Sequence, residues 1–554
     1  MQEKLPSHIS GDAVEQALGN PRRSEVEKEI CYTPEVPRRS TFRSILLVMT
    51  CTFAMVLQTS NTTSVSIALP TIGQDIGIQE DQLQWLVSAY SLSSGCLLLF
   101  FGRIADLHGR KKAFIVGSSF QLVFSLGGGF ADDGNTLTII RGFQGLGAAA
   151  LIPSAMGILA HAFPSSSRAR SIAFATFAAG APVGGAFGTM VGGAVTQLSQ
   201  QRWRATFYVA AAFSALCCIG GLISFEADKK STEVDKRIDW IGAGLVTLGL
   251  VLIVFVLGQG SLAPQGWSTG YIIAMLVVGV FLVGSFLVWE HFLEKIADDT
   301  FRPRSMWTPP PLMRPSLWTR SNGKIAVVMW VAFLNWCGFN SWTFWAQLYY
   351  QRYLSLSPVL TMIRFIPMFI SGILCNYFVA LLVGKLPLVI FAVSGTLFSA
   401  VSCLLFAIIN PSTTYWAFGF PSTILSVCGA DFVFASGTIF IAQTVLQHEQ
   451  SVAGALLQTM TQLGTAFGLT ISTIVFNSIV KKESAQLGVT LNSQMTNAPA
   501  SANLSGYKAA QWSATAFCLL ASLLGLVFLR NVGVVGHKKE AEEIAHSSQS
   551  EKSI

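Results

Sequence analysis

The sequence predicts an all-α integral membrane protein, and three observations support this fold class. Of the 554 residues, 51% are hydrophobic and only 12% are charged, whereas a soluble domain carries roughly 25% charged residues. Apolar stretches recur from residue 45 to residue 530 with short polar breaks between them. The 49 glycines suit helices that pack closely in lipid, where small residues let backbones approach.

The apolar stretches predict about fourteen transmembrane helices. A helix needs about 20 mostly apolar residues to cross the hydrocarbon core. The stretches of this length are 44–67, 82–101, 113–131, 136–160, 171–197, 205–225, 239–258, 270–290, 324–349, 358–382, 387–409, 415–444, 450–479 and 511–530.

The longer polar breaks predict two six-helix bundles with two extra central spans. Two such repeats place a substrate site at their interface, near the membrane midplane. The expected parts are a disordered cytosolic tail (1–43), an N-terminal bundle (44–225), two inserted spans (226–290), a Pro-rich cytosolic linker (291–323), a C-terminal bundle (324–530) and a second cytosolic tail (531–554).

The distribution of Lys and Arg predicts that both termini are cytosolic. With this orientation, 28 of the 36 basic residues lie in inside segments and six lie in outside segments, as the positive-inside rule requires. The sequon Asn503-Leu504-Ser505 then falls in an expected outside loop, 480–510, so Asn503 is a candidate glycosylation site. The polar first forty residues lack the apolar core of a cleavable signal peptide.

Several classes of function are disfavoured. The net charge of +7 comes from basic residues between spans, so we expect no nucleic-acid partner. Nine of the ten cysteines lie in apolar runs, which indicates packing and not a disulfide framework or a metal site. The sequence contains no phosphate-binding loop and no hydrolase or metalloprotease motif. We therefore expect no enzyme activity, no cofactor and no coupling to ATP.

The strongest local pattern is the loop 102–112 between the second and third spans. It combines an acid with a basic cluster and two glycines that permit helix ends to approach closely. The acid can meet a helix N-terminus or an arginine of a neighbouring helix. A generic basic cytosolic loop is the alternative. The residues concerned are Gly102, Asp106, Gly109, Arg110 and Lys111.

This loop resembles the signature loop of the major facilitator superfamily. In the fourth span, Arg141-Gly142-Phe143-Gln144-Gly145 resembles the Arg-x-x-Gln-Gly motif of that family. In the fifth, Gly180-Ala181-Pro182-Val183-Gly184-Gly185 is similar to the motif of its antiporters. Ala68-Leu69-Pro70 ends the first span as in the fourteen-span drug:proton antiporters. The resemblance covers roughly 44–530 and is greatest to fungal exporters of the aminotriazole and boron resistance type and to metabolite pumps.

The resemblance implies a secondary transporter that exports small molecules or drugs in exchange for protons, and we expect it to be a monomer. The plasma membrane is the implied location, with the vacuolar membrane as the alternative. Three residues depart from the family pattern. Leu107 stands where the loop has a basic residue, and Ala181 stands where the fifth-span motif has Gly. Asn61 stands where the first span has Asp, so an acid is lost there.

Asp431 and Arg141 are the candidates for proton coupling. Asp431 is the clearest acid deep within a span. A charge at that depth costs several kcal/mol unless it is paired, hydrated or neutralised. The Asp431 carboxyl can therefore exchange a proton, or it can form a structural hydrogen bond between helices. The resemblance associates Arg141 with coupling. Because an arginine is always charged, it can bias a carboxyl or a substrate, or it can hold a purely structural contact.

The fifth span carries small residues at a four-residue spacing. Such a face suits close helix packing, and Pro182 removes a helix hydrogen bond. The resemblance implies a hinge or a seal against proton leak at Gly180, Pro182, Gly184 and Gly185, and simple packing is the alternative. Polar side chains within other spans are candidates for a substrate cavity because unpaired amides in lipid are costly. These are Asn61, Gln144, Asn335, Asn340, Gln458 and Gln462.

Two other functions stay open on the sequence alone. The first is a facilitator or importer, for example of siderophores, that moves no protons, and the loss of the acid at position 61 favours it. The second is a membrane sensor that transports nothing. Long folded tails would favour a sensor, whereas the tails here are short and polar.

Overall fold

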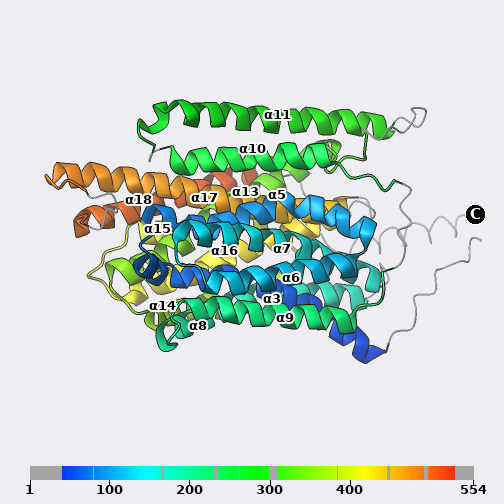
Figure 1. Cartoon of the computed structure of the whole chain (residues 1–554), viewed down its shortest axis with the longest axis horizontal. Helices are drawn as coiled ribbons and strands as arrows, with labels where there is room; N and C mark the ends of the chain where they lie inside the picture. Colours follow the sequence, from blue (N-terminus) through cyan, green and yellow to red (C-terminus); the bar gives the residue numbers. More distant parts are fainter. Residues whose placement is uncertain are drawn as a thin grey trace, which may run out of the picture.

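The computed structural model describes residues 40–78, 80–163, 168–228, 235–260, 263–298, 308–382, 385–445, 450–491 and 497–530. Every regular element within these ranges is a helix, and the long helices run side by side (Figure 1). The expected all-α membrane fold is therefore confirmed. Of the two tails expected to be disordered, residues 1–39 and 531–554 lie outside the described residues. Residues 41–43, expected to belong to the first tail, instead form the start of a helix.

The N-terminal half is a bundle of six long helices. Within it α3 packs along α8 and α9, and α7 lies against both α5 and α6. The helices are α3 (Thr41–Ile76), α5 (Trp85–His108), α6 (Arg110–Gly129), α7 (Gly134–Ala162), α8 (Arg168–Leu198) and α9 (Arg204–Ser224), with a short α4 (Glu80–Leu83) before α5.

The C-terminal half is a second bundle of six. Here α13 packs along α17 and α18, and α16 lies against both α14 and α15. The helices are α13 (Lys324–Leu348), α14 (Pro358–Leu382), α15 (Leu388–Ala407), α16 (Tyr415–Thr444), α17 (Gln450–Gln486) and α18 (Ala500–Phe528), with a short α12 (Ser316–Thr319) before α13 and a π-helical turn, η2 (Tyr349–Tyr353), after it.

Glycines mark the same packing relationship in both halves. A β-carbon on Gly184 of α8 would lie 2.5 Å from the carbonyl oxygen of Val56 in α3. A β-carbon on Gly468 of α17 would lie 2.5 Å from Cα of Cys337 in α13. In each half one glycine-bearing helix therefore packs backbone to backbone on the first helix, which is what a repeated architecture produces.

The two halves meet along two lines of helix contact, which we call seams. One seam joins α5 to α17 and the other joins α8 to α14. Each seam therefore joins the glycine-bearing helix of one half, α17 or α8, to a helix of the other half, α5 or α14.

The two inserted helices lie outside the two bundles. They are α10 (Trp240–Gln259) and α11 (Gly270–Asp298), joined through a 3-10 turn, η1 (Gly266–Ser268). Helix α10 packs on both α5 and α17, whereas α11 packs on α10 (Figure 1). Only 17% of the most apolar stretch of α11 is buried inside the protein, so the rest of the protein leaves most of this stretch exposed.

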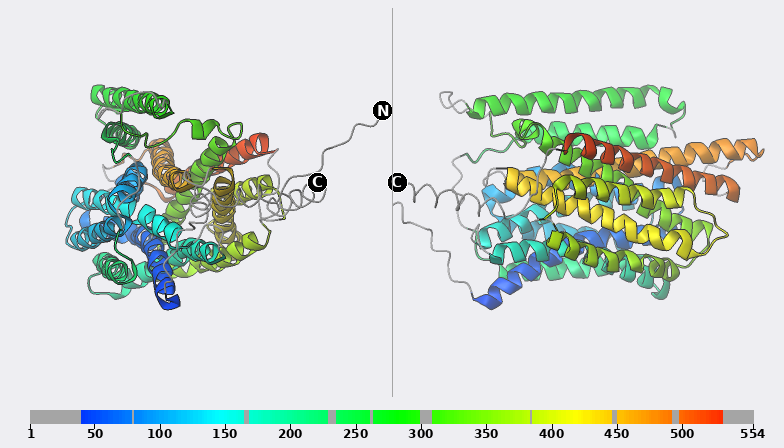
Figure 2. Two further views of the ribbon diagram at one scale, coloured as in Figure 1. Left: turned by 90° about the vertical axis from the view of Figure 1, so that its right-hand side faces the viewer. Right: turned by 180° about the vertical axis from the view of Figure 1, so that it is seen from behind.

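The ends of the bundle are distinguished by the described chain ends. Helix α3 begins and helix α18 ends at the same end of the bundle, which we call the near end (Figure 2). The opposite end, where α3 finishes at Ile76 and α18 begins at Ala500, is the far end.

Side-chain caps stabilise the start of some of the helices. Hydrogen bonds from Thr136, including its amide at 2.8 Å, hold the pKa of Asp133 before α7 below its ordinary value.

Thirteen of the described helices are long and apolar enough to cross a membrane. The expected span 113–131 is occupied by α6, which has 20 residues but begins with Arg-Lys-Lys and carries Ser and Gln. These residues lower its hydropathy, yet α6 packs against α7 and α9 as a member of the bundle. Each of the fourteen expected spans is thus occupied by a helix.

Several expected boundaries were wrong because polar ends extend the helices beyond the apolar core. Helix α3 continues through Pro70 to Ile76, where Gly77 ends it with a positive φ of 67°. Helix α11 continues to Asp298, so the linker expected to begin at residue 291 starts later. Helix α18 begins at Ala500 and not at residue 511, and this places Asn503 in its first turn and not in a loop.

Candidate functional site

Arg141 lies at the centre of the N-terminal half, two turns into α7. It is fully buried. Its Nε donates to the carbonyl oxygen of Leu86 at 2.7 Å, and its Nη1 donates to Asn61 Oδ1 at 2.9 Å and to Gln144 Oε1 at 2.7 Å. The guanidinium also lies over the ring of Tyr90, 4.6 Å from the centroid. Arg141 thus ties α3 and α5 to α7.

Further buried amides extend this group to α6. Asn61 Nδ2 donates to Gln121 Oε1 at 3.1 Å, and Gln121 Nε2 donates to the hydroxyl of Tyr90 at 3.3 Å. Gln144 Nε2 donates to Ser125 Oγ at 2.9 Å. The six side chains form what we call the Arg141 cluster: Asn61, Tyr90, Gln121, Ser125, Arg141 and Gln144.

The groups that accept hydrogen bonds from Arg141 are all neutral. In the part of the chain that the structure describes, no carboxylate pairs with it, and its Nη2 has no hydrogen-bond partner. Asn61, the neighbour that could carry an acid, offers only an amide oxygen. A buried cation without a counter-ion is costly in a membrane, so the cluster holds a fixed positive charge that can attract an anion or repel a proton.

Asp431 lies in the C-terminal half, midway along α16. Its Oδ2 accepts a hydrogen bond of 2.8 Å from Nδ2 of Asn376 in α14, which also donates to the carbonyl oxygen of Gly372 at 3.0 Å. Both Asp431 and Asn376 are partly exposed. The carboxyl is therefore held at the face that α16 shares with α14 and is still reachable from outside the protein interior.

Pro182 of α8 and this carboxyl both lie next to Gly372 of α14. A β-carbon on Gly372 would lie 3.6 Å from Asp431 Oδ2 and 3.5 Å from Cβ of Pro182. The absence of a side chain at position 372 thus brings the acid of one half and the proline of the other to the same point of the α8–α14 seam. The described contacts of Arg141 all lie in the N-terminal half, so the two candidates for proton coupling do not meet.

The glycines of α8 divide into two faces. Gly180, Gly184, Gly188 and Gly192 face α3, where added β-carbons would meet the backbone of that helix. Gly185 faces the other way, 3.5 Å from Phe369 Cε1 of α14 if a β-carbon is added. Helix α8 runs unbroken through Pro182. Four of these glycines therefore pack α8 on α3, while Pro182 and Gly185 lie at the seam.

The loop 102–112 is anchored within its own half. Asp106 of α5 accepts from Arg110 of α6, with 2.8 Å to Nε, and this is the pairing with a neighbouring helix that the sequence suggested. Gly109 separates the two helices with a φ of 115°, a conformation that favours glycine. Gly102 faces Pro153 of α7. The loop thus fixes the near ends of α5, α6 and α7 to one another.

Asp228, which the sequence analysis missed, caps α6. Its carboxylate accepts from the amides of Lys111 at 2.9 Å and Lys112 at 3.0 Å, two of the unpaired donors at a helix start. Lys111 Nζ donates in turn to the carbonyl oxygens of Leu222 and Phe225 at the end of α9. In the sequence, the only indication of this role is that Asp228 follows closely after the sixth span.

The candidate cavity residues do not converge on one site. Asn61 and Gln144 belong to the Arg141 cluster. Asn340 donates to Thr465 Oγ1 at 3.0 Å within the C-terminal half. Asn335 is fully buried, and neither of its amide atoms has a partner among the described residues. Gln462 lies at the α5–α17 seam opposite Gly95. Gln458, one turn earlier on α17, is partly exposed.

Hydrogen bonds between the two halves gather toward the far end. Ser66 of α3 donates to Gln347 Oε1 of α13 at 2.7 Å. Gln351 and Arg352 of η2 donate to the carbonyl oxygens of Ile67 and Pro70 at 2.8 and 3.3 Å. We call this group the far-end seal. It joins α3 to α13 and η2, so the described structure is closed between the halves at that end.

A sequence profile of the Major Facilitator Superfamily matches residues 51–469, which is most of the chain. The chain belongs to the Major Facilitator Superfamily. The match begins within the first helix and runs through the Arg141 cluster, the α5–α6 loop and Asp431.

Curated relatives from fungi align with most of this superfamily member. The chain is 23% identical to the aminotriazole resistance protein of Saccharomyces cerevisiae over 90% of this chain and 86% of that protein. It is 27% identical to efflux pump terJ of Aspergillus terreus over 78% of this chain and 81% of the pump. It is 28% identical to the low affinity ammonium transporter of Saccharomyces cerevisiae over 81% and 85%.

Solved structures agree in fold. A crystal structure of a peptide transporter, POT, in complex with sulfate superposes with a TM-score of 0.61 at 14% sequence identity. The alignment covers 90% of this chain and 98% of that one. At this identity the likeness concerns the fold alone.

Within this superfamily member, the sequence singled out Arg141 and Asp431 as candidates for proton coupling but named only some of the side chains that contact them. Arg141, Gln144 and Asn61 were expected and lie together. Gln121 and Asn376 were not expected, although each is an amide within an apolar stretch, the same signal that selected Asn335 and Asn340. The protein is a multi-pass membrane transporter, and its relatives include efflux and resistance proteins.

Proposed function

We propose that this transporter exports small molecules or drugs in exchange for protons by alternating access. The observation that carries the proposal is the position of Asp431 at the α8–α14 seam, where it and Pro182 of the other half both lie next to Gly372. A carboxyl at a moving interface can be protonated in one arrangement of the halves and ionised in another. Each state can bias the equilibrium only by its differential free energy in the two arrangements.

Alternating access requires two halves that move against each other, and the two seams supply the sliding surfaces. The far-end seal between α3 and α13 must break when the far end opens. Its hydrogen bonds are few, and each contributes about 0.5–1.5 kcal/mol net, so they favour the closed far end without locking it. The α5–α6 loop supports this motion by making the N-terminal half move as one body.

Arg141 has a supporting role in this proposal. Its charge is permanent, and its contacts lie within one half. It therefore does not carry the transported proton. It supplies a positive field in the N-terminal half that attracts an anionic or polar substrate and opposes the entry of a proton by any route other than Asp431.

The near end is proposed to be cytosolic, with both termini on that side, because most Lys and Arg residues belong to segments at this end. The proposed location is the plasma membrane, with the vacuolar membrane as the alternative, and the proposed functional unit is a monomer. Asn503 then lies outside the cytosol. Its side chain is partly exposed and donates to the carbonyl oxygen of Ala498 at 3.4 Å. We propose that Asn503 is glycosylated, and the attached glycan would replace this hydrogen bond.

A facilitator or importer without proton exchange is the second candidate. It is favoured by Asn61, which leaves the Arg141 cluster with no titratable acid. One relative is named as a low affinity ammonium transporter, so efflux is not the sole activity among the names of similar proteins. A membrane sensor that binds without transport is the third candidate.

Proton flux in proteoliposomes separates these candidates. Purified wild type and Asp431→Asn are reconstituted with a pH-sensitive dye inside, and candidate toxic solutes are added outside. For the antiporter we expect solute to release a pH gradient with the wild type only. Glu290→Gln is the matched control, because Glu290 is also a buried acid but lies in the inserted helix α11, away from both seams.

The outcomes distinguish the three functions. If Asp431→Asn folds and exchanges protons for solute as fast as the wild type, Asp431 is structural and the proposed proton site is wrong. If solute moves in both forms without proton movement, the facilitator replaces the antiporter. If solute binds but no flux is measured in either direction, the sensor is the correct description.

A further inference from the structure

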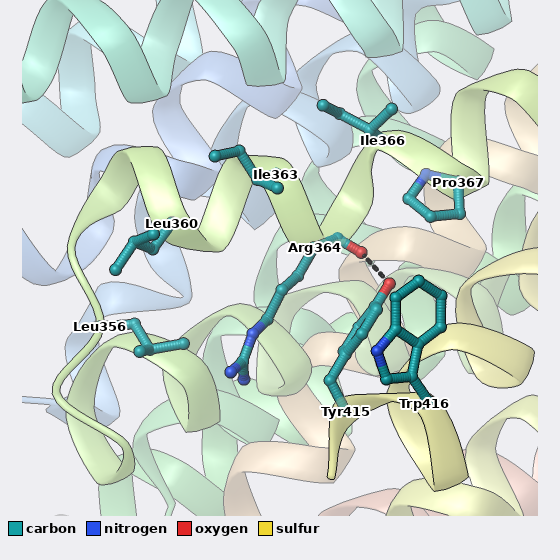
Figure 3. A pocket seen from close by; sticks show the side chains of 8 residues that line it. All are labelled: Leu356, Leu360, Ile363, Arg364, Ile366, Pro367, Tyr415 and Trp416. Atoms are coloured by element: carbon teal, nitrogen blue, oxygen red, sulfur yellow. Dashed lines mark hydrogen bonds between the residues drawn. The ribbon is translucent and has the colours of Figure 1, made fainter.

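A cavity of about 400 Å³ lies at the far end of the C-terminal half, apart from both functional centres. It is formed by the segment before α14, the first turns of α14 and the start of α16 (Figure 3). Its lining residues are Leu356, Leu360, Ile363, Arg364, Ile366, Pro367, Tyr415 and Trp416.

The cavity opens toward the lipid and its walls are apolar. Leu360, Ile363 and Trp416 are 50%, 49% and 68% exposed. An exposed apolar cavity at this place in a membrane protein is filled by hydrocarbon and not by water. Trp and Tyr at the start of α16 are typical of the interface between headgroups and acyl chains, so the cavity lies at the depth where a phospholipid places its phosphate and the first part of its chains.

One charged side chain faces this cavity. The guanidinium of Arg364 lies 4.8 Å from the ring centroid of Tyr350 and 5.5 Å from that of Tyr415. Tyr415 donates its hydroxyl to the carbonyl oxygen of Arg364 at 2.7 Å, which fixes the two helices to each other (Figure 3). Among the described residues no carboxylate pairs with Arg364. The cation is thus held by aromatic rings and has no counter-ion within the part of the chain that the structure describes.

Arg364 is also placed at the right depth for a headgroup. It lies six residues after Pro358, the first residue of α14, and at a rise of 1.5 Å per residue this is about 9 Å along the helix. A long basic side chain near a helix end extends toward the interface. There its donors match the geometry of phosphate oxygens, while Leu360 and Ile363 present apolar surface to an acyl chain.

We propose that this cavity binds an anionic phospholipid of the far leaflet, with its phosphate on Arg364 and one acyl chain along Leu360, Ile363 and Trp416. Charge complementarity selects this occupant. A zwitterionic lipid would place its ammonium group near the same arginine, where no lining residue is acidic. An anionic headgroup balances the single cation without such repulsion.

Lipid binding to the purified full-length protein tests this proposal. Native mass spectrometry in detergent measures binding of phosphatidylglycerol and of phosphatidylcholine with the same acyl chains. We expect the wild type to prefer phosphatidylglycerol and Arg364→Gln to lose roughly tenfold in affinity for it, the effect of removing one charge-assisted contact. Arg364→Lys should restore part of the preference. Lys481→Gln is the matched control, because Lys481 is an exposed far-end cation outside the cavity.

A second variant tests the apolar half of the site. Ile363→Trp fills the cavity from its exposed rim and should weaken phosphatidylglycerol binding although Arg364 is intact. Glycerol 3-phosphate, which has the headgroup charge but no chain, should not compete. The proposal is overturned if Arg364→Gln or Ile363→Trp binds phosphatidylglycerol like the wild type, or if Lys481→Gln weakens binding as much as Arg364→Gln. It is equally overturned if the two lipids bind alike to the wild type, or if glycerol 3-phosphate displaces the lipid at similar concentration.

Discussion

Asn61 Oδ1 accepts a hydrogen bond of 2.9 Å from Arg141 Nη1, and the Asn61 amide donates to Gln121. Asn61→Ala leaves a buried cation and a buried amide oxygen without these partners. We expect it to lower the free energy of unfolding by about 1–3 kcal/mol. Asn61→Asp supplies a counter-ion at the same position and should raise the melting temperature above that of the wild type.

Thermal unfolding in detergent micelles measures both Asn61 variants. Thr62→Ala is the control, because among the described residues the Thr62 hydroxyl bonds only to the carbonyl oxygen of Gln58 in its own helix. A melting temperature of Asn61→Asp below that of the wild type would show that the charge of Arg141 is already balanced by its neutral neighbours.

Gly184→Ala should destabilise the contact between α8 and α3. The added carbon would lie 2.5 Å from the carbonyl oxygen of Val56, so the two backbones must separate, at a cost of about 1–3 kcal/mol. Gly185→Ala is the matched control, since its added carbon would lie 3.5 Å from Phe369, an ordinary contact. Melting temperatures of the two variants should differ by several degrees, and equal values would contradict the packing argument.

Asp228→Ala should weaken the near end of α6. The carboxylate caps two amides of this helix, and the loss of such a cap costs about 1 kcal/mol. Asp228→Asn keeps one acceptor oxygen and should lose less. Hydrogen exchange of the first turn of α6, followed by mass spectrometry, gives the local measurement. Unchanged exchange in Asp228→Ala would mean that the lysine contacts to α9 suffice.

A cross-link across the far-end seal should arrest transport. Ser66 and Gln347 lie in different halves with their oxygens 2.7 Å apart, so the double variant Ser66→Cys, Gln347→Cys places two thiols within reach of a short bifunctional methanethiosulfonate reagent. We expect the reagent to abolish solute flux and a reductant to restore it, because the far end can no longer open.

Each single cysteine variant, treated in the same way, controls for modification of one site. The nine described native cysteines are all unpaired, and seven of them are buried, which limits background reaction. Full transport in the cross-linked protein would mean that the far end does not need to open between α3 and α13.

The fold was largely predictable because membrane helices can be recognised from the length and hydropathy of apolar stretches in the sequence. The exceptions have physical causes. Pro70 suggested a helix end, but a proline is tolerated within a membrane helix when neighbouring groups satisfy the freed carbonyl, and α3 continues to Ile76. The polar residues 291–298 suggested a linker, but they continue α11, where Glu294 accepts from the amide of Ser316 at 3.2 Å.

The candidate site was predictable only in part because single residues reveal depth but not partners. The depth of Asp431 and Arg141 in their spans could be read from the sequence. Their neighbours depend on how each helix is rotated about its axis, which a linear pattern does not fix for helices apolar on all sides. Asn376 therefore became visible as the partner of Asp431 only when α14 and α16 were placed together.

The position of α10 makes the transporter laterally asymmetric. This helix lies over the α5–α17 seam, whereas α8 and α14 present exposed side chains such as Met190 and Ile373 beside their own seam. Under the proposed alternating access, bilayer lipids would enter a widening gap at the α8–α14 seam, whereas α10 covers the α5–α17 seam. An amphiphilic compound dissolved in the membrane would consequently enter the interior from one side only, at the seam that holds Asp431.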